Sequence, residues 1–122
     1  MNKPKYDLED RLIEFGARII KLVDALPGSI ATRHLGGQLV RSGTAPALLY
    51  GEAQAAESRA DFIHKMKIGL KELRETKVSL KLLIKSEFLP PSRLRLILQE
   101  NDELIAIFVT SVLTANGNRK KI

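Results

Sequence analysis

Apolar residues recur at steps of three and four in four successive segments of the chain, and no segment of useful length alternates as a half-buried strand does. This spacing places the apolar side chains on one face of a helix. It predicts four helices, at about 7–26, 32–57, 59–87 and 92–114. The residues expected to form the common core are Leu12, Phe15, Ile19, Leu39, Leu49, Phe62, Met66, Leu73, Leu80, Ile84, Ile105 and Phe108.

Short turn signals separate the four segments. Pro27 and Gly28 stop the first helix, and Ser29 or Thr32 can cap the second. Ser58 can cap the third, and Pro90 with Pro91 precedes the fourth. Because connections this short make neighbouring helices antiparallel, the sequence predicts an all-α, up-down-up-down antiparallel four-helix bundle.

The second segment contains a proline, Pro46, in its interior. It can form two short helices or one helix bent near Ser42 and Gly43, and we favour the bent helix because the apolar stripe continues in phase through the proline. The chain is then a single domain over residues 1–122, with short flexible termini at 1–6 and 115–122.

Composition narrows the class of protein. The chain has no cysteine, which excludes disulfides, thiolate metal sites and a cysteine nucleophile. Its first residues are polar and lack the apolar centre of a signal peptide. No apolar run approaches the roughly 20 residues that span a bilayer. We therefore expect a cytoplasmic protein without a membrane partner.

The sequence lacks the motifs of the common catalytic sites. Neither His34 nor His64 has an acidic or histidine partner three or four residues further along its helix, as a zinc site or catalytic base would need. There is also no Gly-rich phosphate loop and no Gly-x-Ser-x-Gly nucleophile elbow. We therefore expect no catalytic residues, no metal ion and no cofactor.

The third helix carries most of the positive charge. Eight basic and three acidic residues lie between Arg59 and Ser86, whereas the whole chain has a net charge of +6. At 100° per residue, six of the basic residues fall within about one third of the helix circumference. This basic strip consists of Lys67, Lys71, Arg74, Lys77, Lys81 and Lys85. It is either a nucleic-acid-binding surface or a solvated face whose long stems shield the core.

Some apolar residues lie away from the main stripes. On the third helix they are Ile68, Val78 and Leu82, which fall beside the basic strip, and on the first helix Ile13, Ala17 and Ile20 behave similarly. A monomeric bundle needs one apolar stripe per helix, so the extra positions predict a homo-oligomer with Ile68, Val78 and Leu82 at its interface. Scattered surface aliphatics are the alternative.

Several stretches in the second and third segments form a distinctive pattern. They are Gly37–Ala45 (GQLVRSGTA), Gly51–Ala53 (GEA), Ala56–Ser58 (AES), Asp61–Glu72 (DFIHKMKIGLKE), Glu75–Thr76 and Leu80–Leu83 (LKLL). With them the chain resembles the four-helix bundle proteins encoded in intervening sequences of bacterial 23S ribosomal RNA genes. The accessory variability determinant of diversity-generating retroelements is similar to that family. The resemblance covers about Asp7 to Leu113, and the block from Gln38 to Leu83 is its specific part.

The resemblance implies a left-handed four-helix bundle, a ring-shaped homopentamer and a basic surface. It also implies that the accessory relatives bind nucleic acid and associate with a reverse transcriptase. The family often has Asn in a Pro-x-Asn stretch of the second helix, and Tyr-Trp before the Leu-x-Leu-Leu of the third. This chain has an apolar residue in place of that Asn, and Val78 and Ser79 in place of Tyr-Trp. Both changes affect helix packing or an interface.

Two functions agree with these observations. The first is a basic homo-oligomeric bundle that binds RNA or DNA, supported by the basic strip and by Arg119, Lys120 and Lys121 of the tail. The second is a scaffold for protein partners, in which the charge serves solubility. Phosphate contacts weaken steeply with salt and apolar contacts do not, so a salt titration separates the two.

Overall fold

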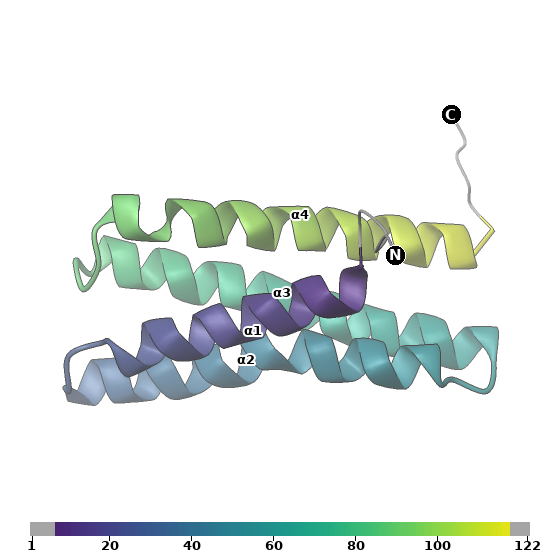
Figure 1. Ribbon diagram of the computed structural model, residues 1–122, viewed down its shortest axis with the longest axis horizontal. Helices are drawn as coiled ribbons and strands as arrows, with labels where there is room; N and C mark the ends of the chain where they lie inside the picture. The colour runs from purple at the N-terminus through teal and green to yellow at the C-terminus, as the bar shows by residue number, and fades with distance from the viewer. Residues whose placement is uncertain (1–6, 118–122) are drawn as a thin grey trace, which may run out of the picture.

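The computed structural model describes residues 7–117, and it confirms the all-α four-helix bundle (Figure 1). The helices are α1 (Leu8–Asp24), α2 (Ile30–Gln54), α3 (Arg59–Lys85) and α4 (Pro91–Ala115). No strand occurs among these residues. Flexible ends are expected from the sequence at 1–6 and 115–122. Residues 1–6 and 118–122 lie outside the described residues, whereas Ala115 still belongs to α4.

The helices pack in the order in which they follow one another along the chain. The most extensive packing is between α2 and α3. The pairs α1–α2 and α3–α4 pack less extensively, and to a similar extent. α1 and α4 also meet, but over much less surface. The bundle is thus a run of three helical hairpins that closes weakly between its first and last helices (Figure 1).

Side-chain caps define the start of three helices. Asp7 accepts a hydrogen bond from the Asp10 amide, and Ser58 accepts one from the Asp61 amide. Ser29, one of the two expected caps of α2, forms a full capping box with Thr32. The predicted α2 start at residue 32 is wrong by two residues, because Thr32 is the third helical residue rather than the cap.

Three predicted helix ends are also wrong. α1 ends at Asp24 rather than at residue 26. α2 ends at Gln54 rather than Glu57. α3 ends at Lys85 rather than Glu87, because Glu87 has a left-handed φ of 64°. The Phe88 amide bonds to the Leu83 carbonyl and the Glu87 amide to the Ile84 carbonyl, which is the Schellman arrangement that ends a helix. α2 does run unbroken through Pro46, as predicted.

The core is aliphatic with two phenylalanines, Phe15 and Phe108, at its centre. Eight of the twelve predicted core residues are buried. The other four are only partly buried, because they lie at the edge of their helix's inward face, and they are Leu49, Phe62, Ile84 and Ile105. Three of them, Phe62, Ile84 and Ile105, pack against the core cluster. Leu104, which is not among the twelve predicted core residues, is fully buried.

Two glycines allow the helices to approach closely. A Cβ atom at Gly43 of α2 would lie 2.9 Å from side-chain carbons of Ile19 on α1. A Cβ atom at Gly69 of α3 would lie 2.7 Å from a ring carbon of Phe108 on α4. Both distances are far below van der Waals contact, so these positions need a residue without a side chain.

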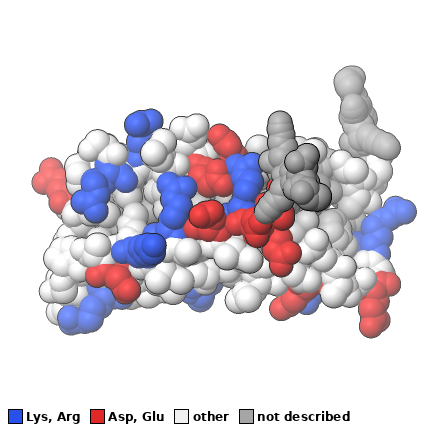
Figure 2. All heavy atoms as spheres, in the orientation of Figure 1, with Lys and Arg blue, Asp and Glu red and all other residues white. Residues whose placement is uncertain are grey.

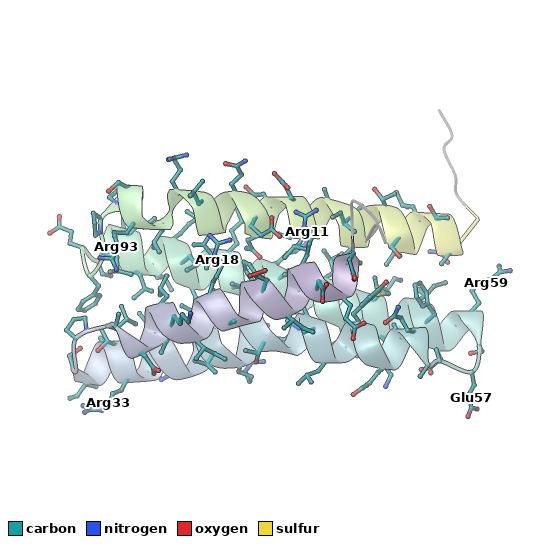
Figure 3. All side chains as sticks on the ribbon, in the orientation of Figure 1. Arg11, Arg18, Arg33, Glu57, Arg59 and Arg93 are labelled. Atoms are coloured by element: carbon teal, nitrogen blue, oxygen red, sulfur yellow. The ribbon has the colours of Figure 1, made fainter. Side chains whose placement is uncertain are left out.

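An arginine ties α1 to α4 where the bundle closes. The Arg11 guanidinium contacts Glu100 at 2.7 Å and Glu103 at 2.9 Å. The hydrogen bond to Glu100 is the main reason why the pKa of Arg11 is raised. Acidic and basic side chains meet near the middle of this face (Figure 2), and Arg11 lies there between the two helices (Figure 3).

No helix within residues 7–117 combines the length and the apolar composition needed to cross a membrane.

Candidate nucleic-acid interface

The basic strip lies along the outer side of α3, opposite its buried face. The buried face carries Met66, Leu73 and Leu80, which keep α3 in one rotational position against its neighbours. Residues half a turn away are therefore directed to solvent. Five strip residues are exposed, namely Lys67, Lys71, Arg74, Lys81 and Lys85.

Lys77 differs from the rest of the basic strip. It is half-buried, and its Nζ lies 2.9 Å from Oδ1 of Asp102 on α4. The other five residues form no ion pair with any residue between 7 and 117. The basic strip therefore offers five free cations, and a sixth that already has an acidic partner.

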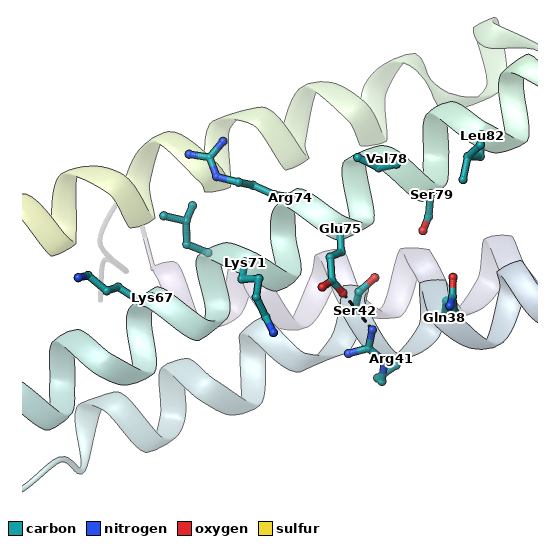
Figure 4. Close-up of a pocket in the computed structure, with 11 residues that line it drawn as sticks. Gln38, Arg41, Ser42, Lys67, Lys71, Arg74, Glu75, Val78, Ser79 and Leu82 are labelled. Carbon is teal, nitrogen blue, oxygen red and sulfur yellow. Dashed lines mark hydrogen bonds and ion pairs between the residues drawn. The ribbon is translucent and has the colours of Figure 1, made fainter.

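A groove of about 820 Å³ runs beside the basic strip, between α3 and α2 (Figure 4). We call it the α2–α3 groove. Its walls combine cationic, polar and aliphatic side chains, with a single carboxylate. The lining residues are Gln38, Arg41, Ser42, Lys67, Leu70, Lys71, Arg74, Glu75, Val78, Ser79 and Leu82.

The groove unites two sets of residues that the sequence predicted separately. Lys67, Lys71 and Arg74 of the basic strip line it together with Val78 and Leu82 of the predicted oligomer interface. The two apolar side chains are 58% and 45% exposed, respectively. Any partner that covers them must therefore also meet the nearby cations. The third predicted interface residue, Ile68, is half-buried and does not line the groove.

Arg41 of α2 is a member of this site that sequence reasoning missed. Its Nη1 lies 2.8 Å from Oε1 of Glu72. Its Nη2 lies 3.0 Å from Oε1 of Glu75, a pair that Figure 4 shows. The hydrogen bond to Glu75, followed by the charge of Glu72, raises the pKa of Arg41. Arg41 thus satisfies the nearly buried Glu72 and joins α2 to α3 at the edge of the groove.

Buried polar groups lie beneath the groove. The Thr76 hydroxyl of α3 lies 2.9 Å from the Ser42 hydroxyl of α2 and 2.9 Å from the Glu72 carbonyl oxygen. One helix further, the Asn101 side chain of α4 donates from Nδ2 to the Leu73 carbonyl at 3.2 Å. These bonds connect the three helices at one level and fix the register of the walls of the groove.

The described side chains of this surface are mainly cationic and aliphatic. His34 and His64 are both exposed and lie on different helices. Within residues 7–117 there is no group of three His, Cys, Asp or Glu side chains that could hold a metal ion. What the arrangement provides is a row of free cations beside an aliphatic groove, which is suited to binding a polyanion.

A structural neighbour shares this architecture. It is a protein of unknown function from the S23 ribosomal protein family of Bacteroides thetaiotaomicron. The TM-score is 0.79 and the sequence identity is 31%, over 87% of this chain and 98% of the neighbour. No curated protein matches the chain.

The sequence model of the family described as "23S rRNA-intervening sequence protein" matches residues 5–110. That range contains all of α1, α2 and α3 and most of α4, and it includes every residue of the basic strip and the α2–α3 groove. The chain therefore belongs to the 23S rRNA-intervening sequence protein family.

Proposed function

We propose that this protein binds nucleic acid through the basic strip, as a non-enzymatic accessory protein. The observation that carries the proposal is the row of five exposed cations that have no acidic partner among residues 7–117. By helix rise, Lys67 and Lys85 lie about 27 Å apart. Each side chain can neutralise one phosphate and release its counterion.

Recognition of this kind depends on shape and charge rather than on base sequence. The groove beside the basic strip has aliphatic side chains, Leu70, Val78 and Leu82, and none of its lining residues is aromatic. Stacking of unpaired bases is therefore not a source of affinity here, and phosphate contacts supply it. The family name refers to 23S rRNA, and the resemblance to the accessory determinants of diversity-generating retroelements also favours a nucleic-acid partner.

The test is a gel shift with RNA and with duplex DNA at low and moderate salt. Five phosphate contacts give an affinity that falls about 10²- to 10³-fold between 50 and 200 mM salt. The triple variant Lys71→Glu, Arg74→Glu, Lys81→Glu should abolish binding, because it turns three attractive contacts into repulsive ones. Its helical signal should match that of the wild type, since all three side chains are exposed.

A matched control is available elsewhere on the surface. Arg33→Glu, Arg59→Glu and Arg95→Glu together change the net charge by the same amount at exposed positions outside the basic strip. This control should keep most of the affinity. Equal loss in both triple variants would show that only net charge matters, and binding by neither polymer at low salt would refute the proposal.

A homo-oligomer is the second part of the proposal, with a pentamer as first choice by resemblance. Exposed Val78 and Leu82 on α3, and Ile13 and Ile20 on α1, support it, because such side chains gain stability when a second copy covers them. Light scattering should give about five times the chain mass of 13.6 kDa. A mass of one chain at high concentration would contradict it.

A protein-interaction scaffold is the competing function. The aliphatic part of the α2–α3 groove favours it, because Val78 and Leu82 could take the apolar face of a partner helix. A partner held in this way stays bound as salt rises, whereas nucleic acid is released. Protein capture that resists salt, together with no gel shift, would favour the scaffold.

A further inference from the structure

The weak contact between α1 and α4 leaves a hollow of about 290 Å³ on the side of the bundle away from the basic strip. It lies between the second half of α1 and the first turns of α4. Its floor is aliphatic, with Leu22 from α1 and Leu94 and Ile97 from α4. Arg18 and Lys21 of α1 and Arg93 of α4 surround this floor.

The charged residues that line the hollow are all cationic. None of its lining residues is acidic. Arg18, Lys21 and Arg93 form no ion pair with any residue between 7 and 117. Two turns earlier on α1, Arg11 is paired with Glu100 and Glu103. On α1, therefore, Arg11 is ion-paired, whereas Arg18 has no ion pair among residues 7–117.

Arg18 and Arg93 lie on one face of the bundle (Figure 3). Arg18 projects from α1 and Arg93 from the start of α4, and both are labelled on the visible side of the bundle (Figure 3). On the same side, Lys and Arg side chains lie around an uncharged surface towards the left end (Figure 2). The uncharged surface and its cationic border correspond to a site for a molecule with an anionic head and an apolar body.

The size and chemistry of the hollow select the ligand class. About 290 Å³ is at the lower end of small-molecule sites, so the occupant is a small molecule rather than a polymer. Guanidinium groups match the oxygens of phosphate with paired hydrogen bonds, and a lysine adds a point charge. The aliphatic floor gains free energy when an apolar group covers it.

We propose that this hollow binds a small organic phosphate. The phosphate contacts Arg18, Lys21 and Arg93, and the organic part lies on Leu22, Leu94 and Ile97. A nucleotide and a lipid-like alkyl phosphate share this chemistry. Because the ligand touches both α1 and α4, it adds contacts where the bundle closes weakly, and its binding stabilises the folded state.

The experiment is a methyl NMR titration of the full chain with adenosine 5′-monophosphate and, separately, with n-octyl phosphate. Saturable shifts are expected at the methyl groups of Leu22, Leu94 and Ile97, with at least one of the two probes. The probe that saturates at the lower concentration identifies the source as nucleotide-like or lipid-like. Adenosine and inorganic phosphate are the controls, and each should bind at least tenfold more weakly.

Variants test the cationic border. Arg18→Gln with Arg93→Gln should weaken the better probe at least tenfold, whereas Arg33→Gln with Arg59→Gln removes equal charge elsewhere and should not. The methyl shifts of the wild-type protein locate the binding site without relying on any variant. No saturable shift with either probe, shifts centred on α3, or equal binding of inorganic phosphate would overturn the proposal. None of these results contradicts the proposal that the basic strip binds nucleic acid, which the gel shift tests separately.

Discussion

Leu73→Ala should lower the free energy of unfolding by about 2–5 kcal/mol. Leu73 is completely buried in the middle of α3 and belongs to the common core. Truncation removes apolar contacts and leaves a cavity that close-packed neighbours fill only in part. Urea unfolding followed by the helical signal measures the loss.

Leu48→Ala is the matched control for this change. Leu48 lies in the middle of α2 and is 70% exposed, so the same truncation there should change the free energy of unfolding by no more than about 0.5 kcal/mol. Similar losses for Leu73→Ala and Leu48→Ala would contradict the described core.

Asn101→Asp should destabilise the protein by about 3–5 kcal/mol at neutral pH. Asn101 is fully buried, its Nδ2 donates to the Leu73 carbonyl, and its Oδ1 has no hydrogen-bond partner among residues 7–117. The substitution places a carboxylate beside a carbonyl oxygen with no cation to compensate it. Unfolding by urea at pH 7 measures the effect against the wild type.

The pH dependence of the Asn101→Asp variant identifies the cause. Burial raises the pKa of the new carboxyl group in the folded state, whereas in the unfolded state it ionises near pH 3.9. The unfolded state therefore loses its proton first as pH rises, and the difference from wild type grows above about pH 4. It should shrink again as the pH falls towards 4.

Asn101→Leu separates charge from shape at the same position. It removes the unpartnered Oδ1 and keeps a similar volume, so the free energy of unfolding should change far less than in Asn101→Asp. Equal destabilisation by both substitutions, or a pH-independent effect of the first, would show that a buried charge is not the cause.

The sequence predicted the helices well and their ends less well. The apolar spacing gives the number and order of helices directly, because each helix must bury one face. The position of a helix end depends on single cap residues, and two neighbouring residues of the sequence can be equally good caps. Ser29 and Thr32 are both good caps, and only the folded chain shows that they bond to each other. Glu87 adopts a left-handed conformation that glutamate rarely takes, so its residue type did not predict the end of α3.

The candidate site was predicted only in part. Helix phase places the basic strip correctly on the surface of α3, because it needs no knowledge of the neighbouring helices. It cannot show that Lys77 pairs with Asp102, or that Arg41 spans Glu72 and Glu75. These pairs join residues 25 to 34 positions apart, so they depend on how α3 is aligned with α2 and α4.

The sequential packing of the helices has a consequence for how the chain folds. Nearly all contacts between helices join each helix to the next one along the chain. Such contacts close short loops, so little chain entropy is lost before stabilising contacts form. Topologies of this kind fold in microseconds to milliseconds. The docking of α1 on α4 is the exception, since it joins the two ends of the bundle, and it is the step with the largest entropic barrier and the fewest contacts to offset it.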